Sequence, residues 1–562
     1  MPHVVTQACC GDASCVFACP VNCIHPSPDE PDFLTAEMLY IDPDSCVDCG
    51  ACVSACPVGA IMPDSKVPAD QLPFVDINAL FFANDRPYPI QAPVPATVKL
   101  GDDRRTLRVA VVGSGPAALY AADELLKQSG VEVNVFDKLP TPYGLVRAGV
   151  APDHQRTKTV DGLFRQIEDQ DGFGYFLNVG IGTDLSHAEL LAHHHAVLYA
   201  TGASVDRALG IPGEELPGSV TATDFVAWYN GHPDFADRVF EFSDKRAVIV
   251  GNGNVALDVA RILTSDPAEL ALTDIAEHAL EALRRSQIEE VVLLARRGVA
   301  QAAFTLPELV GLLSHHDVDF VVDGSELVLD PVTARHRAAG DLDPGLERKI
   351  VAMEQLAASP DLSRRRKRIV FRYLVSPTEF TPGNLRVVRN RLEVDGGGVV
   401  GAVATATTES IDTQLMLRSI GYRGVALTDI PFDEATGVVP NDGGRVTDTH
   451  STYVAGWIKR GPSGYIGTNK TCAHETVSNL LRDFNDGLLP GPAHTRKSLA
   501  ALVAKRKPDA IDLCGWRAID TVERGRGHAS GKVRQKFTDT AEMVDTAHLK
   551  RPTRRRFART ST

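Results

Sequence analysis

The spacing of cysteines near the N-terminus constrains this chain more than any other feature. Nine of its eleven cysteines lie between residues 9 and 56, and four of them form the run Cys46-x2-Cys49-x2-Cys52-x3-Cys56 followed by proline. In such a run three thiolates bind one iron–sulfur cluster and the fourth binds a second cluster. Tetrahedral iron takes four soft ligands, and the two-residue gaps let the backbone wrap around the cluster. Zinc is the weaker alternative, because zinc ribbons use paired two-cysteine knuckles.

The same run occurs earlier in the chain with one exchange. In Cys9-x2-Asp12-x2-Cys15-x3-Cys19, again followed by proline, Asp12 stands where a ligand cysteine would be. If each run lends its last cysteine to the other, one cluster is bound by Cys19, Cys46, Cys49 and Cys52, and the other by Cys9, Cys15 and Cys56, with Asp12 as a further candidate ligand. We expect [4Fe-4S] in the first site and [3Fe-4S] in the second, with a labile [4Fe-4S] cluster as the alternative. Cys10 and Cys23 are expected to be free thiols packed near the clusters.

Charge and hydropathy narrow the class of protein. Residues 1–75 hold ten Asp or Glu and one Lys, a net charge of −9 within a total of −14. This acidity argues against nucleic acid as a partner, because phosphate binding needs clustered Lys and Arg. No apolar run reaches the roughly 18 residues of a membrane span, and the N-terminus lacks the parts of a signal peptide. We therefore expect a cytoplasmic protein whose cysteines bind metal and do not form disulfides.

The rest of the chain divides into two dinucleotide-type units. A Pro-rich stretch up to residue 106 is typical of a semi-rigid linker. A strand at 107–113, a glycine turn, a helix and a strand at 131–137 form one βαβ unit, and the segments from 246 to 297 form a second. A strand at 452–458 and a following helix are expected to complete the first unit. The expected domains are 1–75, a linker 76–106, the first nucleotide domain 107–205 with 421–490, the second 206–420, and an extension 491–562.

The end of that extension is strongly basic. Lys550, Arg551 and Arg559 belong to this tail, together with Arg554, Arg555 and Arg556. The simplest interpretation is a solvated end, and docking to an acidic partner or surface is the alternative.

The first glycine turn reads Gly113-Ser114-Gly115-Pro116-Ala117-Ala118. Such a turn lets the backbone approach a pyrophosphate at a helix N-terminus, where the amide groups and the helix dipole favour an anion. The next strand ends in Asp137, where an acid accepts ribose hydroxyl groups and repels a 2′-phosphate. This site therefore suits FAD or NAD.

The second turn predicts a different nucleotide. Gly251, Asn252, Gly253 and Asn254 open a second turn of the same pattern, but the following strand ends in Arg296-Arg297. Arginine binds a 2′-phosphate in bidentate fashion, so this site suits NADP. The alternative is that both arginines are only a solvated strand end.

These residues together resemble a known family, the adrenodoxin reductase type of ferredoxin–NADP reductase fused to a bacterial ferredoxin of the seven-iron type. The resemblance covers nearly the whole chain and rests on VVGSGPAALYAADELL, LPTPYGLVRAGVAPDH, GNGNVALDVARIL, RRGVAQAAFTLPE and YVAGWIKRGPSGYIGTNK. It implies an α/β fold with two Rossmann-like domains, the NADP domain inserted in the FAD domain, preceded by a small α+β ferredoxin domain with two clusters.

The resemblance also assigns residues. It implies FAD contacts at Gly113, Gly115, Ala117, Asp137, Leu145, Ile181, Trp457, Gly464, Tyr465 and Ile466. It implies NADP contacts at Arg207, Gly251 to Asn254, Arg296, Arg297, Glu308 and Gly464. Asp153 and His154 resemble the family's pair near the flavin, and with Glu308 they are expected to position or tune the reaction.

The function implied is electron transfer between NADPH and ferredoxin or another one-electron iron–sulfur carrier through FAD. Hydride delivers two electrons at once and a cluster takes one, so a flavin has to bridge them. One alternative is an NADPH-oxidising input subunit of a larger oxidoreductase, similar to the small subunit of glutamate synthase. Another is a redox-sensing module whose cysteines bind zinc.

Overall fold

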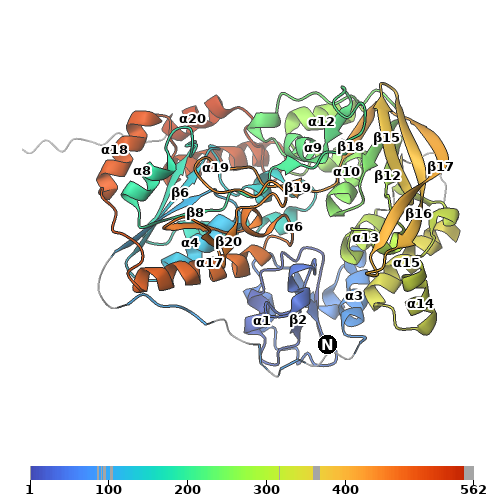
Figure 1. Ribbon diagram of the computed structural model, residues 1–562, viewed down its shortest axis with the longest axis horizontal. Coiled ribbons are helices and arrows are strands. Elements are labelled where there is room, and N and C mark those ends of the chain that lie inside the picture. The colour runs from blue at the N-terminus through green and yellow to red at the C-terminus, as the bar shows by residue number, and fades with distance from the viewer. Residues whose placement is uncertain are drawn as a thin grey trace, which may run out of the picture.

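The computed structural model describes residues 2–84, 88–89, 91–92, 96–101, 106–315, 317–358 and 367–549. The basic tail from Lys550 onward lies outside them. Within the described part of the chain, none of the helices combines the length and the apolar character of a membrane span. Figure 1 shows two large α/β parts side by side, with the N-terminal domain lying against both.

The N-terminal part, here called the cysteine-rich domain (residues 2–81), is a small α+β unit. Its elements are β1 (His3–Val5), α1 (Ser14–Ala18), β2 (Ile24–His25), β3 (Tyr40–Ile41), α2 (Ala51–Ala55), β4 (Ile61–Pro63) and α3 (Pro73–Phe81). β1 pairs with β4 and β2 with β3, both antiparallel. The two short helices α1 and α2 pack against each other. Each begins directly after a residue with positive φ, Ala13 in one case and Gly50 in the other.

Helix α3 corrects the predicted end of this domain. The boundary expected at residue 75 falls inside the helix, and residues 76–81 are not linker. The buried Asn78 amide accepts hydrogen bonds from the backbone N–H groups of Val5 and Ile41 at 3.1 and 2.9 Å. It also donates to the Val5 carbonyl oxygen at 2.8 Å. Because unpaired buried backbone groups are costly, this side chain fixes α3 to β1 and β3.

The first sheet has seven strands in the order β20-β21-β22-β8-β5-β6-β7. They are β5 (Leu107–Val112), β6 (Val131–Asp137), β7 (Phe173–Leu177), β8 (Ala196–Tyr199), β20 (Asn441–Asp442), β21 (Arg445–Val446) and β22 (Thr452–Val454). The strands from β22 to β7 are parallel, and the apolar run of β5 suits a central strand that is buried on both faces. Helices α4 (Pro116–Leu126) and α17 (Thr468–Asn485) pack against each other beside it.

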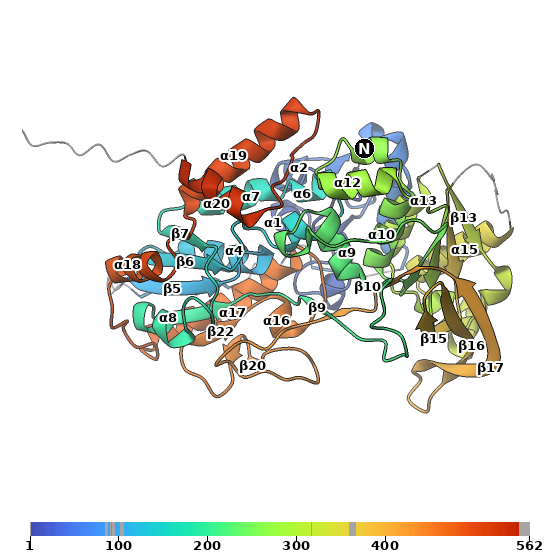
Figure 2. The ribbon, with the colours of Figure 1, turned by 90° about the horizontal axis from the view of Figure 1, so that it is seen from above.

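The second sheet is formed by residues that lie between the two parts of the first. Its parallel strands follow the order β10-β18-β11-β12-β14-β13. They are β10 (Ser219–Thr221), β11 (Arg246–Val250), β12 (Glu290–Leu294), β13 (Val318–Val322), β14 (Lys367–Arg372) and β18 (Leu415–Arg418). Its helices include α9 (Ala222–Tyr229), α10 (Asn254–Thr264), α12 (Glu277–Arg284), α13 (Leu306–Leu313), α14 (Pro331–Ala339) and α15 (Pro344–Ala358). A separate antiparallel sheet of β15 (Val375–Thr381), β16 (Asn384–Val394) and β17 (Val400–Asp412) lies at its outer side (Figure 2). The predicted fold class is confirmed.

Two predicted strands are shorter than expected. The strand that was expected to end in Arg296-Arg297 ends at Leu294, so both arginines follow it. The segment 452–458 is a strand only to Val454, because Gly456 with φ +76° turns the chain into α16 (Trp457–Arg460).

The C-terminal extension is folded as far as residue 549. It forms α18 (Arg496–Arg506), α19 (Leu513–Ala529) and α20 (Thr540–Leu549). The buried Glu523 of α19 accepts from Arg147 at 2.9 Å, and Lys536 contacts Asp274 at 2.8 Å. Lys158 reaches the same carboxylate at 2.8 Å. The extension thereby joins the helices around the two sheets.

Candidate functional site

The first glycine turn has the geometry of an anion-binding site. Gly113 has φ +103°, and a Cβ there would lie 2.4 Å from the Ala200 carbonyl oxygen. Gly115 precedes α4, and no side chain caps the helix N-terminus. Its first amide groups therefore remain available to a phosphate. Asp137 at the end of β6 accepts from Ser114 N at 2.9 Å and Ser114 Oγ at 2.5 Å, which places its carboxylate beside the turn.

The remaining residues that the resemblance assigns to FAD come from three other segments. Leu145 begins α5 (Leu145–Ala148), and Gly144 before it lies against Gly115. Gly456 lies against Ala117, which brings the end of β22 to the start of α4. Next in the chain, Trp457 donates from Nε1 to the Ser463 carbonyl oxygen at 2.9 Å.

The turn before α17 follows directly. Gly464 has φ +75°, and Thr468 Oγ1 accepts from Tyr465 N at 2.9 Å. Ile466 packs against the core that the cysteine-rich domain shares with the first sheet. Ile181 lies further away in sequence, in the loop after β7, where it bridges to Leu185.

The second glycine turn lies at the end of β11. Gly251 has φ +124°, and a Cβ there would lie 2.0 Å from the Ser419 carbonyl oxygen. Gly253 precedes α10 without a side-chain cap. The turn is fixed to the loop before α13, because Asn252 O accepts from Phe304 N at 2.8 Å and Asn254 Oδ1 from Thr305 N at 2.9 Å.

Three arginines predicted to contact NADP lack an ion pair among the described residues. Several other arginines of this domain are paired, such as Arg372 with Glu326 at 2.7 Å. Within the described residues Arg207, Arg296 and Arg297 form no salt bridge. The Gly251 amide donates to Leu294 O at 2.9 Å, so the segment that carries Arg296 and Arg297 follows directly beside the turn. Arg207 lies after β9 (Val205–Asp206), in the connection between the two sheets.

Asp153, His154 and Glu308 are brought together by a residue that sequence reasoning missed. The buried Arg261 guanidinium contacts Asp153 at 2.5 Å, Glu308 at 2.9 Å and Asp258 at 2.5 Å. It also lies 2.8 Å from His154 Nε2. A charged pair at positions 258 and 261, inside the otherwise apolar helix LDVARIL, is the sequence signal that marks this network.

Burial and neighbouring charges shift the pKa values of this network in opposite directions. Burial alone would raise the pKa of Asp153, but Arg261 and then His154 outweigh it, and the pKa lies well below its ordinary value. Burial raises the pKa of Asp258 to about 6, against the effect of Arg261. Burial likewise opposes ionisation of Glu308, yet Arg261 and His154 keep its pKa below the ordinary value. One cation therefore holds several carboxylates in a fixed arrangement.

The cysteine-rich domain extends into this network through Glu37. Its carboxylate accepts a short hydrogen bond from Thr305 Oγ1. Burial, followed by the Glu308 carboxylate, raises the pKa of Glu37 well above its ordinary value. Sequence analysis gave no signal for this contact, because residues 37 and 305 are far apart in the chain.

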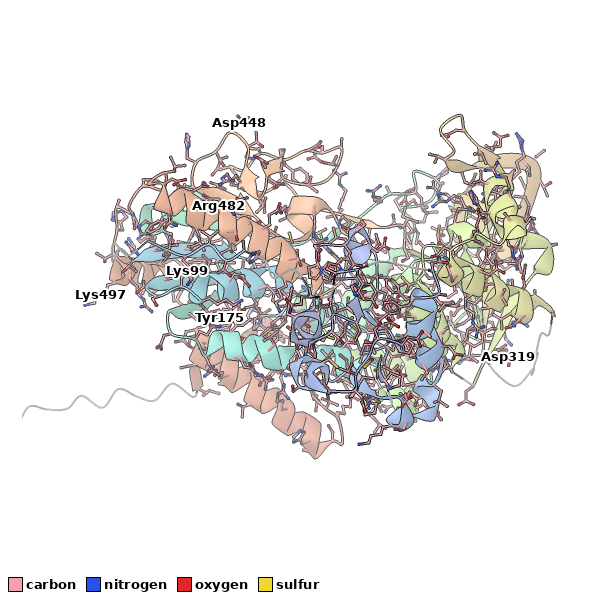
Figure 3. All side chains as sticks on the ribbon, turned by 90° about the horizontal axis from the view of Figure 1, so that it is seen from below. Lys99, Tyr175, Asp319, Asp448, Arg482 and Lys497 are labelled. Atoms are coloured by element: carbon pink, nitrogen blue, oxygen red, sulfur yellow. The ribbon has the colours of Figure 1, made fainter. Side chains whose placement is uncertain are left out.

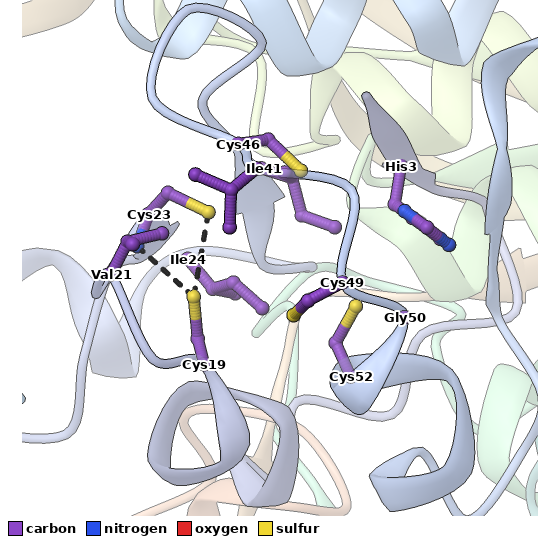
Figure 4. A pocket seen from close by; sticks show the side chains of 11 residues that line it. His3, Cys19, Val21, Cys23, Ile24, Ile41, Cys46, Cys49, Gly50 and Cys52 are labelled. Atoms are coloured by element: carbon purple, nitrogen blue, oxygen red, sulfur yellow. Dashed lines mark hydrogen bonds between the residues drawn. The ribbon is translucent and has the colours of Figure 1, made fainter. Parts of the chain in front are cut away.

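Five cysteines line one pocket of the cysteine-rich domain, namely Cys19, Cys23, Cys46, Cys49 and Cys52. Figure 4 shows Cys19, Cys46, Cys49 and Cys52 around a space closed by Ile24 and Ile41, among others. Sequence reasoning assigned these four to one cluster and left Cys23, whose Sγ lies 3.5 Å from Cys19 Sγ, as a free thiol packed nearby. All eleven cysteines are free thiols. We call Cys19, Cys46, Cys49 and Cys52 the outer site, and its apolar walls and four soft donors fit an iron–sulfur cluster.

A second set of thiols from the two cysteine runs lies close enough together for their charges to interact. We call Cys9, Asp12, Cys15 and Cys56 the inner site. Burial, then the neighbouring Cys56 and Asp12, raises the pKa of Cys9 to about 12, and Cys9, Asp12 and Cys56 act likewise on Cys15. Taken as free thiols, these groups disfavour one another's ionisation, so the site favours a cation or cluster that compensates their charge.

The sites have matching amide donors. Ala60 N donates to Cys56 Sγ at 3.3 Å, and Cys23 N donates to Cys19 Sγ at 3.4 Å. Each last cysteine of a run thus receives an N–H group from four residues further on. Such bonds favour the thiolate that binds metal.

Two thiol-lined sites and two glycine turns in one chain define the class of protein: an oxidoreductase with a fused iron–sulfur domain. Residues 107–300 match the family described as pyridine nucleotide-disulphide oxidoreductase, and residues 39–62 match the 4Fe-4S binding domain. A probable ferredoxin/ferredoxin–NADP reductase of Mycobacterium tuberculosis is 55% identical, covering 99% of this chain and 97% of the relative. The chain belongs to the ferredoxin/ferredoxin–NADP reductase family.

Two further similarities each cover 79% of this chain. The mitochondrial NADPH:adrenodoxin oxidoreductase of Arabidopsis thaliana is 39% identical and covers 79% of this chain and 96% of that protein. The solved structure of Mycobacterium tuberculosis FprA in complex with NADPH is 42% identical, with a TM-score of 0.74. It covers 79% of this chain and 100% of that chain. The predicted family is confirmed.

Proposed function

We propose that this chain passes electrons between NADP(H) and one-electron iron–sulfur carriers, with FAD at the first turn and NADP at the second. The observation that carries the proposal is the position of the cysteine-rich domain, which contacts the surroundings of both glycine turns. It contacts α17 beside the first turn and, through Glu37, the loop that holds the second. Viewed from below, it lies in front of the junction between the two larger parts (Figure 3).

The residues around the first turn fit FAD. The uncapped N-terminus of α4 offers amide groups to the pyrophosphate, and Asp137 offers a carboxylate to the ribose. Trp457 and the turn Gly464 to Ile466 belong to the same site by the family resemblance. FAD held by these residues would supply the chemistry that couples a two-electron hydride donor to one-electron carriers.

The residues around the second turn fit NADP. Arg296, Arg297 and Arg207 are cations without a carboxylate partner in the described part of the chain, and a 2′-phosphate supplies the missing anion. The Arg261 network holds Asp153, His154 and Glu308 in fixed positions, and the ion pairs around Arg261 restrict movement of α10. We assign to these three residues positioning of the nucleotide, and no proton transfer.

The two thiol-lined sites differ in the cluster that they suit. Four cysteines at the outer site suit [4Fe-4S]. At the inner site Asp12 is already engaged, because its Oδ2 accepts from Ser14 Oγ at 2.5 Å and its Oδ1 from Ser14 N at 3.3 Å. A carboxylate held in this way supports [3Fe-4S] with Cys9, Cys15 and Cys56. The set of free thiols is also consistent with a reducing compartment, and we keep the cytoplasm as the proposed location.

The NADP assignment is tested by replacing Arg296 and Arg297 with Ala. The expected loss is about 2–4 kcal/mol of NADPH binding, because charge-assisted contacts to the 2′-phosphate disappear. NADH binding should change little. The measurement is the dissociation constant of each nucleotide, with Arg246→Ala as the control for removing an arginine that is already paired. Equal losses for NADPH and NADH would contradict the assignment.

A further inference from the structure

The two thiol-lined sites are placed very differently relative to the part of the chain that binds nucleotides. The loop of residues 8–14, here called the inner loop, lies on the N-terminus of α17. Gly467 N donates to the Cys10 carbonyl oxygen at 2.7 Å. A Cβ on Gly467 would lie 2.1 Å from Asp12 N, so only glycine permits this approach. Gly467 comes one residue after the turn Gly464 to Ile466.

Side chains reinforce the same contact. Lys470 Nζ donates to Ser14 Oγ at 2.9 Å and lies 3.4 Å from Asp12 Oδ2. Thr157 Oγ1, from α6 (Gln155–Lys158), donates to the Ala8 carbonyl oxygen at 3.4 Å. The inner loop is therefore held by two segments that are distant from each other in sequence.

A buried hydroxyl of α4 lies beneath the inner loop without a partner. The Tyr120 side chain is 1% exposed, and its hydroxyl has no hydrogen-bond partner among the described residues. Burial, and next the charges of Cys10 and Asp12, raises the pKa of Tyr120 well above its ordinary value. Because an unpaired buried hydroxyl is costly, its position indicates that a group absent from the protein chain accepts the hydrogen bond.

The outer site reaches solvent at Cys49, although its Cys52 is buried, and at the inner site Cys9 and Cys56 are partly buried. Cys49 is exposed, and its neighbours Val47 and Val53 are 58% and 38% exposed. At the inner site Cys15 and Asp12 are each 5% exposed. Helix α1 connects the sites, because Cys15 lies in its first turn and Cys19 is its C-cap. Four residues of helix correspond to a rise of about 6 Å.

We infer that the inner site is where electrons enter the cysteine-rich domain and that the outer site is where they leave it. This order rests on the proposed function. The two electrons of one hydride pass singly through the inner and then the outer site to two external one-electron acceptors, and the proton goes to solvent. Gly467, Lys470 and Tyr120 are positioning residues that hold the inner site against α4 and α17.

The first test breaks the inner contact without touching a thiol. Gly467→Ala should overpack the inner loop and slow reduction of the inner cluster about tenfold or more after mixing with NADPH. Bleaching of the flavin should keep its parental rate. The matched control is Gly525→Ala in α19, where an added Cβ meets nothing within 4 Å. Parental reduction of the inner cluster in Gly467→Ala would overturn the inference.

The second test changes the charge at the same contact and adds no bulk at Gly467. Lys470→Glu should slow the same step, because it places a carboxylate opposite Asp12. Adding Ser14→Lys should restore the rate by supplying the opposite charge from the other side. The cluster signals in electron spin resonance report whether each variant still holds its clusters. Slowing that Ser14→Lys does not reverse would contradict a role for this pair.

The third test removes the exit. In Cys49→Ser, NADPH should still reduce the inner cluster, whereas cytochrome c reduction should be lost. Cys514→Ser, at an exposed thiol of α19 outside the cysteine-rich domain, should behave like the parent. Loss of inner-cluster reduction in Cys49→Ser would reverse the order. If NADPH fails to bleach flavin in the parent protein, the proposed function is wrong, and not merely the order.

Discussion

The two halves of the cysteine-rich domain have the same sequence pattern but opposite surroundings. Each has a short helix that follows a residue with positive φ, and each last cysteine receives an amide N–H from four residues further on. Where the second half has the exposed Cys49, the first has the buried Asp12. The second half faces solvent, and the first is covered by α4 and α17.

The two halves differ most at one equivalent position, which is Cys49 in the second run and Asp12 in the first. Cys49 lines the outer pocket with four other cysteines, whereas Asp12 accepts a hydrogen bond from Ser14 and lies beside Lys470 of α17. Asp12, at the position where the second run has Cys49, thus takes part in a contact between domains. The linker is consistent with this fixed seating, because Gly101 N donates to Asn485 Oδ1 of α17 at 3.0 Å.

Removing both halves should have the largest effect. A chain lacking residues 1–95 should lose cytochrome c reduction by about tenfold or more, because the tethered domain works at high effective concentration. Ferricyanide reduction should persist, since both glycine turns remain. The two assays are compared at equal flavin content. Unchanged cytochrome c reduction would show that the clusters are not on the main route.

Making the two halves alike should change the cluster type. Asp12→Cys supplies a fourth thiolate, so the oxidised three-iron signal should be replaced by a second [4Fe-4S] signal in electron spin resonance. Asp12→Asn is the control, because it removes the charge without adding a thiolate, and it should keep the three-iron signal. Two stable four-iron clusters in the parent protein would refute the [3Fe-4S] assignment.

Tyr120→Phe should change the midpoint potential of the inner cluster and leave that of the outer cluster unchanged. If the hydroxyl donates to the inner cluster, its loss should lower the midpoint potential of that cluster, because a donor stabilises the more negative reduced form. The outer potential should not move. Tyr175→Phe is the control, because that buried tyrosine already donates to Glu168 at 3.0 Å. Equal potentials in the parent and Tyr120→Phe would remove Tyr120 from the account.

The smallest expected effect is a pH dependence of the seating. The pKa of Glu37 is raised by burial and by Glu308, with Asp258 adding to the rise. The seated form therefore holds a proton that the free form releases. The contact of the cysteine-rich domain with the rest of the chain has its full stability below the ordinary glutamate pKa of about 4.3. It weakens as the pH rises toward the raised pKa of Glu37. Internal electron transfer should slow with rising pH in the parent and stay level in Glu37→Gln, and the same slope in both would exclude Glu37.

Local pattern predicted much of this molecule. The cysteine spacing indicated the two thiol sets, and the glycine turns with Asp137 and Arg296 indicated two nucleotide sites, because each of these signals lies within about 50 residues of sequence. The contacts that position the sites were not predictable in this way. Ser14 meets Lys470 across 456 positions of sequence, and neither residue type is unusual at its place. Asn78 and Arg261 act through burial, which a single sequence does not display.

The order of the two clusters is tested most directly by rapid mixing with NADPH, followed by freezing and electron spin resonance. We predict that the oxidised three-iron signal of the inner site disappears before the reduced four-iron signal of the outer site grows. Growth of the four-iron signal first would contradict the account, as would an inner site that stays oxidised while an external acceptor is reduced.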